Sequence, residues 1–239
     1  ISLIGRNGTN WCVTYIAVVT YGAVIVPILQ DFNPNDVHHI VNHSDSTLLF
    51  ISDSIWETLE EEKVADLRAV FSLNDFRCLH QKDGEAIVKA TKALPKAFEK
   101  RYPNGFTAAD VLYPTIPNSE LVCISYTSGT TGFSKGVMLT ANNLAGNIAF
   151  GVTTGLLGKG DRTLAFLPLA HAYGCAFDFL TSFCVGAHTT YLGKVPSPKI
   201  LLKAFAEVKP TVIFTVPLII EKIYRKQIQP MLNSRSMRW

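Results

Sequence analysis

The sequence has little charge, and the charge it has is nearly balanced. Charged residues make up 17% of the 239 positions, and 22 Lys and Arg against 19 Asp and Glu leave a formal net charge of +3. This small excess does not indicate nucleic acid or an anionic membrane as the main partner. The hydrophobic content of 48% excludes a disordered chain. The length suffices for one large or two small domains.

Cysteine is scarce and follows no pattern. The five cysteines are scattered and include no C-x-x-C pair, so the sequence predicts neither a disulfide framework nor a zinc ribbon. We therefore expect a reducing, cytoplasmic location. The residues are Cys12, Cys78, Cys123, Cys175 and Cys184.

Long uncharged runs are also few, and one of them could be either a membrane span or a buried helix followed by a strand. Trp11–Leu29 carries no charged residue and is about as long as a membrane-spanning helix. Gly22 and Pro27 interrupt it, however. This placement favours a buried helix ending near Tyr21, followed by a β-strand, over a membrane span.

Short β-rich runs alternate with helical stretches through most of the chain, which is typical of parallel strands joined by crossover helices. Several runs are continuously apolar, as expected for strands that are covered on both faces. The sequence therefore predicts an α/β fold with a layered, mostly parallel twisted sheet and helices on both faces. The expected strands are Ala23–Ile28, Thr47–Ser52, Ala69–Ser72, Leu121–Tyr126, Val137–Thr140, Thr163–Leu167, Thr189–Leu192 and Thr211–Val216.

Proline and glycine mark the expected helix ends. Asn33-Pro34 and Ser197-Pro198 each combine a capping side chain with proline at the first helical position. Gly186 is expected to end a helix that begins near Ala172.

Composition divides the chain into three segments. Residues 73–119 carry the charged run Lys89–Arg101 and a proline-containing stretch, so we interpret them as a polar surface helix and a linker. Because the chain begins with Ile1 rather than Met, we expect residues 1–239 to be part of a longer protein. The segments are 1–72 (first sheet segment), 73–119 (polar helix and linker) and 120–239 (phosphate-loop segment).

The most informative stretch is Tyr126–Gly136, which reads Tyr-Thr-Ser-Gly-Thr-Thr-Gly-Phe-Ser-Lys-Gly. Glycines let backbone N–H groups approach an anion, hydroxyls donate further hydrogen bonds, and the lysine adds positive charge. The composition suits a polyphosphate cradle, but it also suits a hairpin turn between two strands. Gly129, Gly132 and Lys135 do not have the spacing of the G-x-x-x-x-G-K-[ST] loop, which disfavours a P-loop NTPase.

This stretch, with the Val-Met-Leu-Thr that follows it, resembles the signature of the adenylate-forming superfamily. That superfamily includes acyl-CoA synthetases, firefly luciferase and the adenylation domains of peptide synthetases. Leu167–Gly174 resembles its Leu-Pro-x-x-His segment, and Tyr21–Pro27 is similar to its Gly-Ala-x-x-Val-Pro strand. Val137–Thr140 and Val216–Tyr224 are most similar to long-chain fatty acid–CoA ligases.

The resemblance implies a reaction and a set of residues. A fatty acid carboxylate attacks the α-phosphate of ATP with Mg²⁺ present, and the thiol of coenzyme A then takes the acyl group from the acyl-adenylate. Lys135 and His171 are the implied catalytic residues, with His171 lining the junction of the acyl and phosphate pockets. Ser134 stands where the family usually has proline, which loosens the loop without removing a donor. The implied phosphate-binding residues are Thr127, Ser128, Gly129, Thr130, Thr131, Gly132 and Lys135.

Other parts of the family pattern have no counterpart in the sequence. These are the Tyr-Gly-x-Thr-Glu segment, whose Glu helps to hold magnesium, the ribose-binding Asp and the lysine of the C-terminal domain. The chain is therefore expected to be a partial N-terminal AMP-binding domain without the C-terminal domain, inactive by itself. Two alternatives stay open: a non-catalytic nucleotide- or acyl-binding module, and an adenylating enzyme for an aryl or amino acid.

The expected partners are small molecules: a fatty acid, ATP and coenzyme A. We expect neither nucleic acid nor a transmembrane segment, and a peripheral membrane contact of the full-length protein stays open. His39 and His43 have an i, i+4 spacing that can hold zinc, but no third ligand with suitable spacing is evident, so no metal site is predicted. The sequence indicates neither the acyl chain length nor the oligomeric state.

Overall fold

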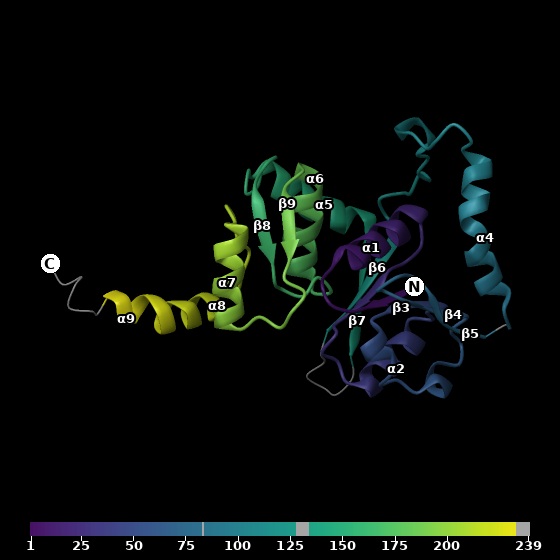
Figure 1. Cartoon of the computed structure of the whole chain (residues 1–239), viewed down its shortest axis with the longest axis horizontal. Coiled ribbons are helices and arrows are strands. Elements are labelled where there is room, and N and C mark those ends of the chain that lie inside the picture. The colour runs from purple at the N-terminus through teal and green to yellow at the C-terminus, as the bar shows by residue number, and fades with distance from the viewer. Residues whose placement is uncertain (83, 128–133, 233–239) are drawn as a thin grey trace. The chain divides into compact units, whose positions relative to one another are not determined.

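The computed structural model describes residues 1–82, 84–127 and 134–232 (Figure 1). The chain divides into two compact units, Ile1–Ala145 and Gly146–Trp239. The described part of the chain contains no helix that is both long enough and apolar enough to cross a membrane.

The first unit is built on a five-stranded sheet in the order β2-β1-β3-β4-β5. The first four strands run parallel, and β5 pairs antiparallel with β4 at the edge. This is the mostly parallel sheet that the alternation of strands and helices predicts. The strands are β1 (Ser2–Ile4), β2 (Val26–Ile28), β3 (Leu48–Ile51), β4 (Ala69–Ser72) and β5 (Cys78–Gln81).

Helices α1 (Thr9–Tyr21) and α2 (Pro34–His43) cover opposite faces of this sheet (Figure 1). Helix α1 ends at Gly22 in the left-handed conformation, with φ of 87°. The Asn33 side chain caps α2 by accepting a hydrogen bond from the Asp36 N–H at 3.0 Å. The apolar side of α2 packs on the sheet in a core that includes Val37, Ile40, Val41, Ile4, Val26, Leu49, Ile51 and Val70.

A β-hairpin lies beside β2 as a separate two-stranded sheet. Strands β6 (Leu121–Thr127) and β7 (Lys135–Thr140) pair antiparallel, and an isolated parallel bridge joins Cys123 of β6 to Ile25, the residue before β2. The Ile25 N–H donates to the Val122 carbonyl, and the Ile124 N–H donates to the Ile25 carbonyl, both at 2.9 Å. Backbone hydrogen bonds therefore hold the hairpin against the core of the first unit.

The remaining elements of the first unit connect these strands. Helix α4 has no buried residue, and Figure 1 shows it standing away from the sheet. The elements are α3 (Asp53–Trp56), η1 (Glu61–Val64), α4 (Ala86–Arg101) and η2 (Ala108–Asp110).

The second unit contains two parallel strands, β8 and β9, and several helices. Helix α5 begins in the first unit and continues into the second. The π-helix η3 is continuous with α6, which ends at Gly186 with φ of 74°. Ser197 caps α7, which packs its apolar side against β8 and the residues that follow it. The elements are α5 (Ala141–Thr153), β8 (Arg162–Ala165), η3 (Gly174–Thr181), α6 (Ser182–Val185), β9 (His188–Tyr191), α7 (Pro198–Val208), α8 (Pro217–Ile223), η4 (Tyr224–Ile228) and α9 (Gln229–Leu232).

The predicted α/β fold class and most predicted strands are confirmed, but one predicted strand is wrong and two observed strands were not predicted. The strand predicted at Thr211–Val216 is wrong, because this segment forms a single isolated bridge from Val212 to Thr163 before Pro217 begins α8. The short strand β1 was not predicted, since three residues are too few to show a pattern. The edge strand β5 was missed as well, because its sequence Cys-Leu-His-Gln is short, half polar and without β-branched residues.

Candidate functional site

The residues that flank the connection between β6 and β7 lie side by side at that end of the hairpin. Thr127, the last residue of β6, is directly opposite Lys135, the first residue of β7. Both side chains are exposed. Five of the predicted phosphate-binding residues, Ser128, Gly129, Thr130, Thr131 and Gly132, lie outside the described residues. The hairpin thus brings a hydroxyl and an ammonium group together beside that segment.

Tyr126 anchors this end of the hairpin in the core of the first unit. Its side chain is 5% exposed and packs with the apolar residues that α2 and the sheet bury. A Cβ at Gly136, its partner on β7, would lie 3.1 Å from the Tyr126 ring and 2.9 Å from Ile124. The absence of a side chain at Gly136 therefore makes room for the Tyr126 ring, which anchors this end of the hairpin.

The Tyr126 hydroxyl lies 2.7 Å from Nδ1 of His43, which belongs to the last turn of α2. The two rings meet edge to face, with centroids 5.8 Å apart. Burial, with a smaller contribution from Asp45, raises the pKa of Tyr126, so the hydroxyl stays protonated near neutral pH. Its proton is available to His43, and sequence reasoning missed this contact because 83 positions separate the two residues.

The zinc alternative for His39 and His43 has no support in the described residues, which contain no group of three or more potential ligands. The two imidazole rings are neighbours, with centroids 5.3 Å apart. Their i, i+4 spacing therefore does place them together, as expected for one helix face.

His171 belongs to the second unit, where it lies in the turn between β8 and η3 and is exposed. Its Nδ1 accepts a hydrogen bond from the Tyr173 N–H at 3.3 Å. In the neutral ring the proton is therefore on Nε2. A Cβ at Gly174 would lie 2.5 Å from the Pro168 carbonyl oxygen, so the turn that carries His171 needs glycine there.

Asp178, on the π-helix that begins three residues after His171, is the functional candidate that sequence reasoning missed. It is fully buried, and neither carboxyl oxygen has a hydrogen-bond partner among the described residues. Desolvation raises the pKa of Asp178 to about 8. π-helical turns occur preferentially at functional sites. The available signal was one acidic residue inside the apolar run Ala-Phe-Asp-Phe-Leu.

Two kinds of chemistry are thus available in the described residues. The hairpin of the first unit offers Lys135 and Thr127, which suit an anion with several oxygen acceptors. The turn of the second unit offers the Nε2–H of a neutral His171 ring, whereas the carboxyl of Asp178 is fully buried.

Comparison with known proteins shows which family the chain matches. The chain matches the AMP-binding enzyme family over residues 1–238. It is 31% identical over 227 residues to the long-chain-fatty-acid–CoA ligase FadD15 of Mycobacterium bovis, covering 94% of this chain and 36% of that protein. It is 28% identical over 220 residues to the peroxisomal long chain acyl-CoA synthetase 7 of Arabidopsis thaliana, covering 91% and 30%. The chain therefore spans about a third of the length of these curated relatives.

Solved structures of low sequence identity share the fold. A red-emitting luciferase from Phrixothrix hirtus superimposes with a TM-score of 0.77 at 18% identity, covering 97% of this chain and 43% of that one. The N-terminal domain of FACL13 from Mycobacterium tuberculosis gives 0.72 at 18% identity, covering 99% and 54%. The match over nearly the whole sequence, together with the hairpin that carries its signature, establishes that the chain belongs to the AMP-binding enzyme family.

Proposed function

We propose that the protein containing this chain activates a long-chain fatty acid to its acyl-CoA. The carboxylate oxygen attacks the α-phosphorus of ATP, the bond to the bridging oxygen breaks, and pyrophosphate leaves. The coenzyme A thiol then loses its proton and attacks the acyl carbon, and AMP leaves. Family membership supports adenylate formation, and the names of the relatives above support the substrate class.

The first proposed role is that of the hairpin. Negative charge gathers on the pyrophosphate as the bond to the α-phosphorus breaks. The Lys135 ammonium and the Thr127 hydroxyl, with the backbone and hydroxyls of residues 128–132, would stabilise that charge. Because the hairpin is bonded to Ile25, next to β2, and anchored by Tyr126, Thr127 and Lys135 would be positioned before the substrate arrives.

The second proposed role is that of His171. In its neutral form the ring can donate the Nε2 proton to an oxygen of the carboxylate or the α-phosphate. The hydrogen bond from the Tyr173 N–H to Nδ1 sets the tautomer and the ring orientation, as a positioned donor requires.

Magnesium and coenzyme A complete the proposed reaction. Magnesium would neutralise negative charge on the phosphates of ATP. An ATP molecule bound at the exposed hairpin can keep this ion. We assign neither magnesium nor coenzyme A ligands among the described residues. The cytoplasmic location stays a prediction.

The observation that carries the proposal is the pairing of Thr127 with Lys135 at the mouth of an anchored hairpin in a member of this family. The test is ATP–pyrophosphate exchange by the full-length protein with a long-chain fatty acid. Lys135→Ala should lower exchange by about a hundredfold or more and leave the free energy of unfolding unchanged, because Lys135 is exposed.

Lys159→Ala, at an exposed turn of the second unit, is the matched control and should leave exchange unchanged. Unaltered exchange in Lys135→Ala would remove Lys135 from the catalytic residues. Exchange that requires an aryl or amino acid instead of a fatty acid would refute the substrate class while keeping the adenylation step.

A further inference from the structure

Helix α4 carries an apolar face that the described residues leave exposed. Leu94 and Phe98 are 63% and 52% exposed, and Phe106 beyond the helix is 49% exposed. The rings of Phe98, Tyr102 and Phe106 form a cluster with centroids 4.9 to 5.7 Å apart. None of the residues of α4 is buried, so this face does not hold the unit together.

The other side of α4 is a row of lysines. Lys89, Lys92, Lys96 and Lys100 follow one another in steps of three and four residues, which places them along one side of a helix. Each of the last three lies two positions from Leu94 or Phe98, and two residues correspond to about 200° around the helix. The lysines and the apolar residues therefore occupy opposite sides.

The charge of this helix is also mostly positive. Residues Ala86–Arg101 include five basic residues and one acidic residue, Glu99. Arg101 lies over the Tyr102 ring, 5.4 Å from its centroid, at the end of the aromatic cluster. The balanced charge of the whole chain conceals this local excess.

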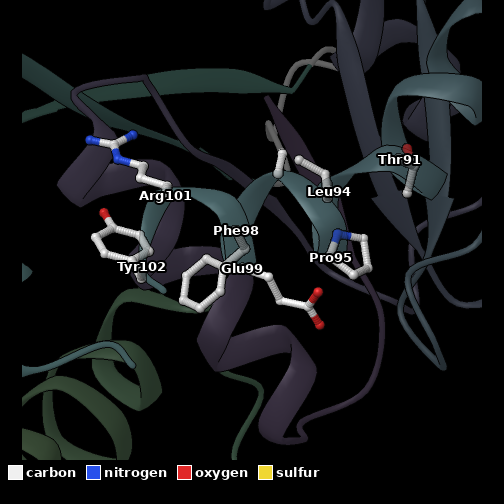
Figure 2. A pocket seen from close by; sticks show the side chains of 8 residues that line it. Thr91, Leu94, Pro95, Phe98, Glu99, Arg101 and Tyr102 are labelled. Carbon is white, nitrogen blue, oxygen red and sulfur yellow. The ribbon is translucent and has the colours of Figure 1, made fainter. Parts of the chain in front are cut away.

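An open hollow beside α4 shows how little covers the apolar face. It has a volume of about 800 Å³, and all the residues that line it come from α4 and the adjoining Tyr102, among them Leu94, Pro95 and Phe98. Figure 2 shows these side chains along successive turns of the one helix. A hollow with a single wall is an exposed surface rather than an enclosed binding pocket.

We propose that α4 and the aromatic cluster after it form a membrane-surface element that lies on an anionic lipid bilayer. A helix with a Leu and Phe face and a Lys face is typical of helices that lie in the plane of the interface. Tyrosine and other aromatic side chains are favoured at that depth. The lysine row complements anionic headgroups, and long lysine side chains can reach them while the apolar face is inserted.

This surface does not rest on the proposed reaction, and its test measures binding rather than turnover. The full-length protein is floated with vesicles of phosphatidylcholine alone and with vesicles that also contain phosphatidylglycerol. We expect binding to the anionic vesicles that weakens as salt is raised. Lys92→Glu/Lys96→Glu should lower the affinity for them about tenfold or more.

Leu94→Ser/Phe98→Ser should abolish binding without changing the net charge. Both double variants should fold, because the substituted side chains are exposed; circular dichroism checks this. Lys199→Glu/Lys203→Glu on α7 gives the same change of charge on a helix whose apolar side is already covered, and should leave binding unchanged.

Several results would overturn the proposal. These are an absence of flotation with anionic vesicles, flotation that both α4 variants leave unaltered, or an equal loss in the α7 variant. Retention on immobilised heparin without any binding to vesicles would likewise overturn it, since this would indicate a polyanion rather than a bilayer.

Discussion

Asp178 should make the protein less stable as the pH rises from about 4 to 8. The pKa of this buried carboxyl is about 8, against an ordinary value of 3.8. Below pH 3.8 the group is protonated in both the folded and the unfolded chain, so its ionisation costs nothing. Between the two pKa values the unfolded chain releases the proton and the folded chain keeps it. Unfolding therefore becomes more favourable by about 1.4 kcal/mol per pH unit, and the loss levels off above pH 8.

The size of the effect follows from the difference between the two pKa values. Ionisation of Asp178 should cost the folded state about 2 kcal/mol at pH 5 and about 5 kcal/mol at pH 8. The difference, between about 3 and 4 kcal/mol, is a large fraction of the total stability of a typical domain.

Asp178→Asn tests this reasoning because asparagine has nearly the same shape and cannot ionise. Its unpartnered amide has a desolvation cost that does not depend on pH, so this cost cancels when the same variant is compared at two pH values. The gain in stability over the parent should grow by about 3 to 4 kcal/mol between pH 5 and pH 8. Urea unfolding followed by circular dichroism measures it.

The experiment has a control variant, and a second titrating group contributes to the pH dependence of stability. Asp66→Asn removes a carboxyl whose side chain is 97% exposed, and should leave the pH profile unchanged. Burial is the largest cause of the lowered pKa of His38, so His38 costs stability as the pH falls below its ordinary value of 6.5. Parent and variants share this opposite trend. Parallel profiles of Asp178→Asn and the parent would refute the argument, because they would mean that Asp178 ionises normally in the folded chain.

Three further predictions concern the hairpin and the whole chain. Tyr126→Phe should lower the free energy of unfolding by about 1 kcal/mol, and the loss should shrink in a His43→Gln background if the 2.7 Å contact carries it; a double-mutant cycle by urea unfolding measures this, and simple additivity would contradict it. Gly136→Ala should cost about 1 to 3 kcal/mol because its Cβ would meet Ile124 at 2.9 Å, whereas Gly146→Ala, whose Cβ meets nothing within 4 Å inside a helix, should be neutral or stabilising. The 239-residue chain alone should bind ATP with at best millimolar affinity, since the family's ribose-binding Asp has no counterpart in it; micromolar affinity by calorimetry would contradict this.

The helix ends were readable from the sequence because their causes are local. Asn33 caps α2 through a side chain three residues from its partner, and Gly22 and Gly186 end helices through their own backbone conformation. Strand pairing depends on residues far apart in the sequence. Cys78–Gln81 forms a strand because β4 offers an edge, whereas Thr211–Val216 has strong β propensity but makes a single bridge.

The site divides in the same way. The resemblance implied that Thr127 and Lys135 bind phosphate, and the composition left a hairpin turn open as an alternative; the structure places the two residues opposite each other on paired strands. The motif could not predict His43, because the contact with Tyr126 arises only when α2 packs on the sheet beside the hairpin. Asp178 left a visible trace, an acid in an apolar run, but its burial depends on the tertiary packing of the π-helix.

Glycine in both signature segments serves contacts that a Cβ would prevent. At Gly136 the space accommodates the Tyr126 ring, which fixes the strand that presents Thr127. At Gly174 the space lets the start of the π-helix approach the Pro168 carbonyl, next to the turn in which His171 accepts the Tyr173 N–H. In each case the missing Cβ leaves room for a contact that fixes the position of a hydrogen-bond donor, Thr127 or His171. Substitutions at these two glycines should therefore misplace Thr127 or His171 even where the chain still folds, and they should reduce pyrophosphate exchange more than their cost in stability explains.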